Sequence, residues 1–215
     1  MLELSLVAAL VLGVLVFVAC TRADRAKDFA AAGSGLGMQF SEDLPAETAA
    51  AIRAIPSVAR RTRNFFPRVL ANPEAMVFDW VWQDDRFKDR NRGTQTVVAL
   101  RVPGARLPRF LFAETEGITR EDARAAGDEV VFTSPPSWLD RYALHGEDKD
   151  TLRRLFPESA RASLVLPAGI RMEGAGEWVI VYAPERDLAP ATFVAELSAA
   201  RALVETWTGA EPDRG

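Results

Sequence analysis

The hydrophobic pattern separates one continuous apolar run at the start of the chain from alternating and periodic segments after it. Residues 4–20 contain no charged side chain. A helix rises about 1.5 Å per residue, so this run approaches the thickness of a bilayer core of about 30 Å. Since a helix satisfies its own backbone hydrogen bonds in lipid, the run predicts a transmembrane anchor over residues 1–21.

Basic residues after the apolar run predict its orientation. Only Glu3 precedes the run as a charged residue, whereas Arg22, Arg25 and Lys27 follow it. Basic residues are retained on the cytoplasmic side, and acidic residues contribute little. We therefore expect a single-pass protein of the bacterial inner membrane, with residues 22–215 facing the cytoplasm.

Two other interpretations of the apolar run stay open. The segment ending in Val18, Ala19 and Cys20 loosely resembles a lipobox, which would make the chain an envelope lipoprotein acylated at Cys20. A cleaved signal peptide is the other alternative. Both usually require basic residues before the run, and their absence favours the anchor.

Alternation of apolar and polar residues predicts strands further along the chain. Met76, Phe78, Trp80 and Trp82 share one face of a strand, which a hairpin would pair with the preceding strand. Similar patterns predict a short strand over 36–40 and a sheet of about seven strands over 65–70, 76–82, 94–102, 108–113, 128–133, 170–173 and 178–183. The short connections between these strands favour antiparallel pairing.

Helical signals separate and follow these strands. Thr119 and Asp122 form a capping-box pattern that opens a short helix. The last helix begins at Pro190 and carries a buried stripe with helical spacing, made of Phe193, Leu197, Ala200, Val204 and Trp207. The predicted fold class is α+β, with the anchor (1–21), a helical juxtamembrane connector containing a short strand (22–62), one globular domain (63–209) and a disordered tail (210–215).

Composition restricts the function more than it identifies it. The formal net charge is -4 and the pI is about 5.2, so the chain lacks the basic character of a nucleic-acid-binding protein. One cysteine cannot form a disulfide within the chain or a thiolate metal site. We expect no cofactor, no metal and no nucleic-acid partner.

Few residues suggest catalysis. His145 is the only histidine, and the chain has no Gly-x-Ser-x-Gly motif, so a catalytic triad is not expected. Asp79 lies within an apolar strand, where we expect it on the solvent face beside an arginine or lysine. An enzyme with a site of dispersed acidic and basic residues, including His145, remains the alternative to a protein without catalysis.

Basic residues near the predicted anchor suggest contact with the membrane surface. Each basic residue near anionic headgroups contributes about 1 kcal/mol. A solvated connector would show the same charges without this role. The predicted contact set is Arg22, Arg25, Lys27, Arg60, Arg61 and Arg63.

Several segments resemble an uncharacterised family of bacterial single-pass membrane proteins. The resemblance is carried by Gly-Met-Gln-Phe (37–40), Val-Phe-Asp-Trp-Val-Trp (77–82), Thr-Val-Val-Ala-Leu (96–100), Tyr-Ala-Leu-His-Gly-Glu-Asp (142–148), Leu-Arg-Arg-Leu-Phe (152–156) and Glu-Trp-Val-Ile-Val-Tyr (177–182). This family implies no activity. The anchor and the lack of a catalytic constellation predict a membrane-anchored cytoplasmic domain that binds or scaffolds. We expect it to contact the bilayer through residues 4–20, and a protein is its other expected partner.

Overall fold

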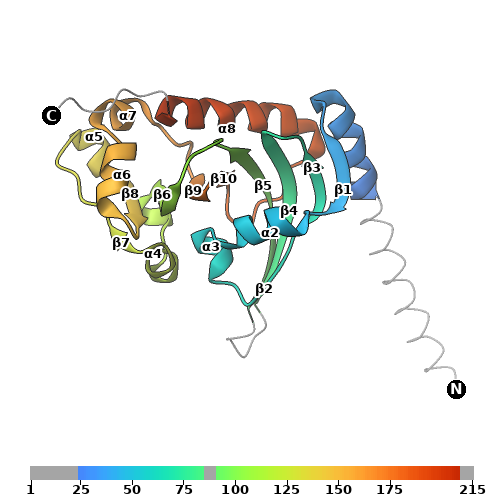
Figure 1. The fold of residues 1–215 in the computed structure, drawn as a ribbon, viewed down its shortest axis with the longest axis horizontal. Coiled ribbons are helices and arrows are strands. Elements are labelled where there is room, and N and C mark those ends of the chain that lie inside the picture. The colour runs from blue at the N-terminus through green and yellow to red at the C-terminus, as the bar shows by residue number, and fades with distance from the viewer. Residues whose placement is uncertain (1–23, 85–90, 209–215) are drawn as a thin grey trace, which may run out of the picture.

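A sheet of ten strands organises the part of the chain that the computed structural model describes, residues 24–84 and 91–208 (Figure 1). Neighbouring strands are antiparallel throughout these residues. Their order is β1-β3-β4-β5-β10-β9-β6-β8-β7, with β2 paired to β4. The strands are β1 (Gln39–Asp43), β2 (Arg63–Phe65), β3 (Pro67–Ala71), β4 (Ala75–Asp84), β5 (Asn91–Arg101), β6 (Leu107–Glu114), β7 (Asp128–Glu129), β8 (Tyr142–Gly146), β9 (Arg171–Gly176) and β10 (Trp178–Tyr182).

Helices cover both faces of this sheet. One helix spans residues 24–36 and ends before Gly37, whose φ of 63° is a left-handed conformation that glycine adopts without strain. The others are α2 (Ala46–Arg53), α3 (Pro56–Ala59), α4 (Arg120–Ala126), α5 (Pro136–Leu139), α6 (Lys149–Leu155), α7 (Glu158–Ser163) and α8 (Phe193–Thr208), with 3-10 turns at Thr115–Gly117 and Pro190–Thr192.

Alternation along β4 directs its side chains into two separate hydrophobic cores. Met76, Phe78, Trp80 and Trp82 lie in one core together with residues of α2 and α3, which confirms that they share a face. Val77 lies in the other core, on the opposite face. Because both faces of the central strands are buried, a polar side chain there needs a partner within the protein.

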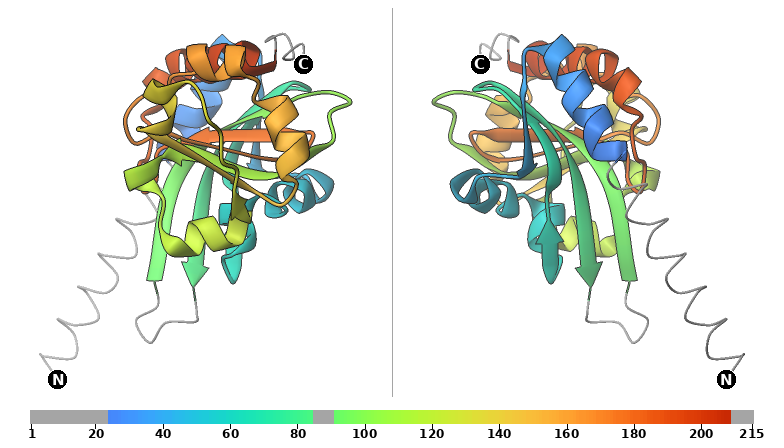
Figure 2. Two further views of the ribbon diagram at one scale, coloured as in Figure 1. Left: turned by 90° about the vertical axis from the view of Figure 1, so that its left-hand side faces the viewer. Right: turned by 90° about the vertical axis from the view of Figure 1, so that its right-hand side faces the viewer.

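The larger core lies beneath α8 and the helix over 24–36. Figure 2 shows these two helices side by side, and the rings of Phe29 and Phe193 meet edge to face with centroids 4.7 Å apart. The stripe predicted for the last helix is confirmed, because the buried residues of α8 are Phe193, Leu197, Ala200, Val204 and Trp207. Helices α5 and α6 also contribute to this core.

Two parts of the predicted fold class need correction. The sheet has ten strands in the described residues instead of about seven. Strands of two or three residues, such as β7 and β2, are too short to show an alternating pattern. The structure also corrects the transmembrane part of the prediction. No helix among the described residues is both long enough and apolar enough to cross a bilayer, and the run over 4–20 lies outside those residues.

The segment predicted as a connector contributes to the sheet and to its cover. Strand β1 pairs with β3, with Phe40 opposite Leu70. Ile52 of α2 and Val58 near the end of α3 are buried in the smaller core. Residues 24–62 therefore share hydrophobic cores with the strands that follow them.

A close approach within the larger core predicts a sensitive glycine. A methyl group on Gly174 of β9 would lie 2.4 Å from the Phe110 ring, which is fully buried. We expect Gly174→Ala to lower the free energy of unfolding by about 1–3 kcal/mol through overpacking. Gly117→Ala is the matched control, since an added methyl group there has nothing within 4 Å. Urea unfolding of both variants measures the difference, and equal stabilities would contradict the packing.

Candidate functional site

A small polar cavity lies on the sheet face that α3 and α4 flank. Its volume is about 130 Å³, below the roughly 300–1,000 Å³ of sites that hold a whole drug-sized ligand. It can therefore take one chemical group of a larger ligand. Its lining includes Arg60, Arg61, Trp82, Gln95, Asp122, Arg171 and Tyr182, and we call it the arginine–tryptophan pocket.

Asp122 joins two of the pocket arginines. Its carboxylate lies 2.9 Å from the guanidinium groups of both Arg60 and Arg171, and its side chain is almost fully buried. The same residue caps α4 in the predicted capping box with Thr119, which the structure confirms. Burial alone would raise the pKa of Asp122, but Arg171, Arg60 and the hydrogen bonds with Thr119 together hold it below its ordinary value.

Arg61 is the least neutralised of the three arginines. Its guanidinium stacks 3.7 Å from the centroid of the Trp82 ring, and the nearest carboxylate of the described residues is Asp84 at 3.9 Å. Burial and the charge of Arg60 lower the pKa of Arg61. Its Nε is buried and has no hydrogen-bond partner among the described residues. Arg61 therefore has donor capacity that the described protein does not use.

A second unused donor lines the same cavity. Gln95 of β5 is 3% exposed, and its Oε1 accepts a hydrogen bond from the backbone N–H of Glu185. Its Nε2 has no partner among the described residues. Buried polar groups are normally hydrogen-bonded, so two unpaired donors around one cavity indicate a place for an acceptor.

A buried carboxylate, that of Glu173, contacts two residues that line the pocket, Ser57 and Tyr182. Glu173 of β9 accepts hydrogen bonds from the backbone N–H and the hydroxyl of Ser57, at 2.8 and 2.6 Å, and from the Tyr182 hydroxyl. Burial raises the pKa of Glu173, although the bonds from Ser57 and Tyr182 oppose this shift. Burial and the nearby Glu173 charge raise the pKa of Tyr182 well above its ordinary value.

The pocket serine and the histidine of the chain lie in different places. The Ser57 hydroxyl donates a hydrogen bond to the Glu173 carboxylate. His145 lies on β8, where its Nδ1 is 3.4 Å from the carbonyl oxygen of Gly127, and it does not line this pocket. Among residues 24–84 and 91–208, no group of three or more His, Cys, Asp or Glu residues is placed to hold a metal ion.

The described residues of the set predicted to contact a membrane surface have different surroundings. Arg60 and Arg61 line the pocket, with side chains 17% and 12% exposed. Lys27 and Arg63 are exposed, and Arg22 lies outside the described residues. Contact of these residues with headgroups remains a prediction, as does the cytoplasmic localisation.

The sixth residue of that set, Arg25, neutralises Asp79. Arg25 donates two hydrogen bonds of 2.8 Å to the two carboxylate oxygens, and Arg68 and Thr96 donate one each. The expectation that Asp79 lies beside an arginine is correct, but its predicted position on the solvent face is wrong, because its side chain is 1% exposed. The helix over 24–36 covers this face of β4, and its Arg25 provides the partner that a buried charge requires.

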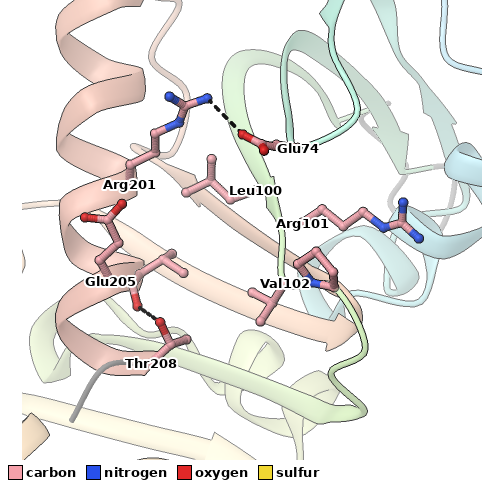
Figure 3. Close-up of a pocket in the computed structure, with 9 residues that line it drawn as sticks. Glu74, Leu100, Arg101, Val102, Arg201, Glu205 and Thr208 are labelled. Carbon is pink, nitrogen blue, oxygen red and sulfur yellow. Dashed lines mark hydrogen bonds and ion pairs between the residues drawn. The ribbon is translucent and has the colours of Figure 1, made fainter.

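A second hollow lies on the opposite face of the sheet, between α8 and β5 (Figure 3). Its volume is about 340 Å³. Leu100, Val102 and Val204 form apolar walls, and Arg201 and Glu74 lie at the rim with 3.9 Å between their charged groups. A further cavity of about 230 Å³ shares Val102 and Thr208 with it. We call the two cavities together the α8 groove.

Comparisons with known proteins show a fold and no family. No protein-family description matches the chain, and no curated protein matches it. Among solved structures, the chain is similar to the mycobacterial trehalose monomycolate transport factor A, TtfA, with a TM-score of 0.55 and 11% identity. The match covers 89% of this chain and 98% of that one. At this identity the likeness shows that the two proteins share a fold.

Two basic residues on one helix provide a matched test of the buried ion pair. We expect Arg25→Ala to lower the free energy of unfolding by about 2–3 kcal/mol, because the Asp79 carboxylate would lose its two-pronged partner while buried. Lys27→Ala should change it by less than about 0.5 kcal/mol, since an exposed ion pair contributes little. The Lys27 side chain is 80% exposed, and its nearest acid, Asp24, is 3.9 Å away. Equal effects in urea unfolding would contradict the assignment.

Glu173 should make stability depend on pH in a defined direction. Its folded-state pKa is raised above the ordinary 4.5, so its contribution is fully present below that value and is lost as pH rises through the folded-state pKa. Compared with Glu173→Gln, the natural chain should therefore lose stability as pH increases above about 4.5. Chemical unfolding across a pH series measures this difference, and parallel curves for the two proteins would contradict it.

Proposed function

We propose that the protein is a binding module whose arginine–tryptophan pocket holds an anionic group, a phosphate or a carboxylate, of a larger partner. One observation carries the proposal. Arg61 is fixed against Trp82 beside a cavity, with a donor that lacks a partner among the described residues and a carboxylate no nearer than 3.9 Å. Guanidinium groups recognise phosphates and carboxylates through planar pairs of hydrogen bonds.

The charges around the pocket support an anion as its occupant. Of the residues that line the cavity, Arg60, Arg61 and Arg171 carry a positive charge, and Asp122 and Glu185 carry a negative charge. Asp84 does not line the cavity, and its carboxylate lies 3.9 Å from Arg61. Glu173 does not line the cavity. Among the lining residues alone, positive charges outnumber negative charges by one. A ligand oxygen placed there would also accept a hydrogen bond from Gln95.

The rigidity of the surroundings also supports binding. Arg60 and Arg171 are held by Asp122, and Arg61 by the Trp82 ring, so little side-chain freedom is lost when a ligand binds. The shape resemblance to TtfA, described as a transport factor for trehalose monomycolate, is compatible with a protein that binds without catalysis. The proposal concerns binding and includes no reaction.

A phosphate titration tests the proposal on the full chain. Inorganic phosphate should give saturable shifts in the side-chain N–H resonances of Arg61 and Gln95, measured by nuclear magnetic resonance. We expect Arg61→Gln to weaken phosphate binding about tenfold, since a hydrogen bond to a charged group contributes about 1.5–3 kcal/mol. A parallel titration with acetate compares carboxylate with phosphate.

The neighbouring basic residue gives the control. Arg63 lies two positions further on, is exposed and does not line the pocket. Arg63→Gln changes the net charge of the chain by the same amount, so it should leave phosphate affinity within about twofold of the natural value. Equal losses in the two variants, or an absence of saturable binding, would contradict the pocket as an anion site.

A further inference from the structure

The α8 groove has apolar walls. Glu74, Arg101, Arg201 and Glu205 are charged residues of the part between α8 and β5, and Arg154 gives the other part a polar end. Leu100, Val102 and Val204 line the part shown in Figure 3. The adjoining part is lined by Ala105, Leu107, Leu155 and Pro157, together with Arg154 and Trp207. The two cavities, of about 340 and 230 Å³, together lie within the roughly 300–1,000 Å³ of small-molecule sites.

Trp207 presents an unused hydrogen-bond donor at this polar end. The residue is 2% exposed, and its ring stacks on Phe156 with centroids 5.2 Å apart. Its indole Nε1 is buried and has no partner among the described residues. A buried tryptophan N–H usually has an acceptor, so a ligand oxygen at this position would satisfy it.

Arg154 provides a positive charge close to that donor. It lines the same cavity as Trp207 and donates a hydrogen bond of 2.8 Å to the hydroxyl of Thr151. Within residues 24–84 and 91–208, no carboxylate forms an ion pair with it. The other arginines along the groove are paired, Arg101 with Glu177 at 2.7 Å and Arg201 with Glu74 at 3.9 Å.

The backbone along the groove is already hydrogen-bonded, which weighs against a peptide strand as the occupant. The N–H groups of Arg101 and Val102 donate to the carbonyls of Glu74 and Glu177, and that of Ala105 donates to Val102. A peptide that binds as an added strand needs unpaired backbone groups at the edge that it joins. A flexible aliphatic chain needs none.

We propose that the α8 groove binds a long-chain fatty acid. The aliphatic chain lies along Leu100, Val102 and Val204. The carboxylate lies at the other end, where it accepts hydrogen bonds from the guanidinium of Arg154 and the indole N–H of Trp207. This site is on the opposite sheet face from the arginine–tryptophan pocket, so it is independent of the proposal made for that pocket.

Palmitate labelled with carbon-13 at its carboxyl carbon is the probe for the full chain. We expect one saturable site, with a shifted carboxyl resonance in the bound state. Hexadecanol has the same chain without the charge and should compete for the site with an affinity about fivefold weaker, as expected for loss of one exposed charge interaction. Equal affinities for the acid and the alcohol would overturn the placement of the carboxylate.

Adjacent arginines on α6 provide a matched pair of variants. Arg154→Gln should weaken palmitate binding about fivefold, whereas Arg153→Gln should leave it unchanged, because Arg153 pairs with Asp150 and does not line the groove. Trp207→Phe removes the N–H but keeps an aromatic ring, and should weaken binding by about fivefold. Identical effects of the two arginine variants would overturn the proposal.

A variant in which a larger side chain fills the groove distinguishes palmitate binding in the groove from binding elsewhere on the protein. Ala105 is half-buried in the connection between β5 and β6 and lines the cavity, so Ala105→Trp should abolish palmitate binding while the unfolding temperature stays near the natural value. Unchanged binding by this variant, or no saturable binding by the natural chain, would overturn the proposal. The proposal would also be overturned if the chain associates with itself, palmitate does not affect this association, and Ala105→Trp prevents it. A second copy of the chain would then occupy the groove.

Discussion

Burial of both faces of the central strands is the constraint on which the structure depends. A polar side chain on such a strand must find its partner in a covering helix or a neighbouring strand. On one face of the sheet, Asp79 accepts hydrogen bonds from Arg25. On the other face, Glu173 accepts hydrogen bonds from Ser57. These buried carboxyl groups therefore fix where the helix over 24–36 and α3 lie on the sheet. The arginine–tryptophan pocket is built beside the second of these contacts.

The sequence predicts elements whose pattern repeats locally. Alternation in β4 and the stripe of α8 each extend over several residues, and both predictions are confirmed. The capping box at Thr119 is also local, because its two members lie three residues apart. Strand number is predicted less well, since β2 and β7 are fixed by pairing with β4 and β8 and have no repeat of their own.

The candidate sites are formed by contacts that leave no local signal. Arg60 meets Asp122, and Ser57 meets Glu173, across long separations in the chain. In the sequence, the arginines at 60, 61 and 63 form one basic run, but only the first two turn into the pocket. A charged residue at an inward position of an apolar strand, such as Asp79 or Glu173, is the sequence feature that could have indicated a buried partner. Such a feature does not identify that partner.

The position of β10 between β5 and β9 has a consequence for synthesis of the chain. Strand β5 pairs with β10, which lies far later in the sequence, and not with β6, which follows it. While a ribosome adds the intervening residues, β5 lacks the neighbour that its edge requires, and the larger core also awaits α8. Sheets dominated by such distant pairings close slowly and expose aggregation-prone edges in the meantime. Nascent chains should therefore depend on chaperones until the last helix has emerged.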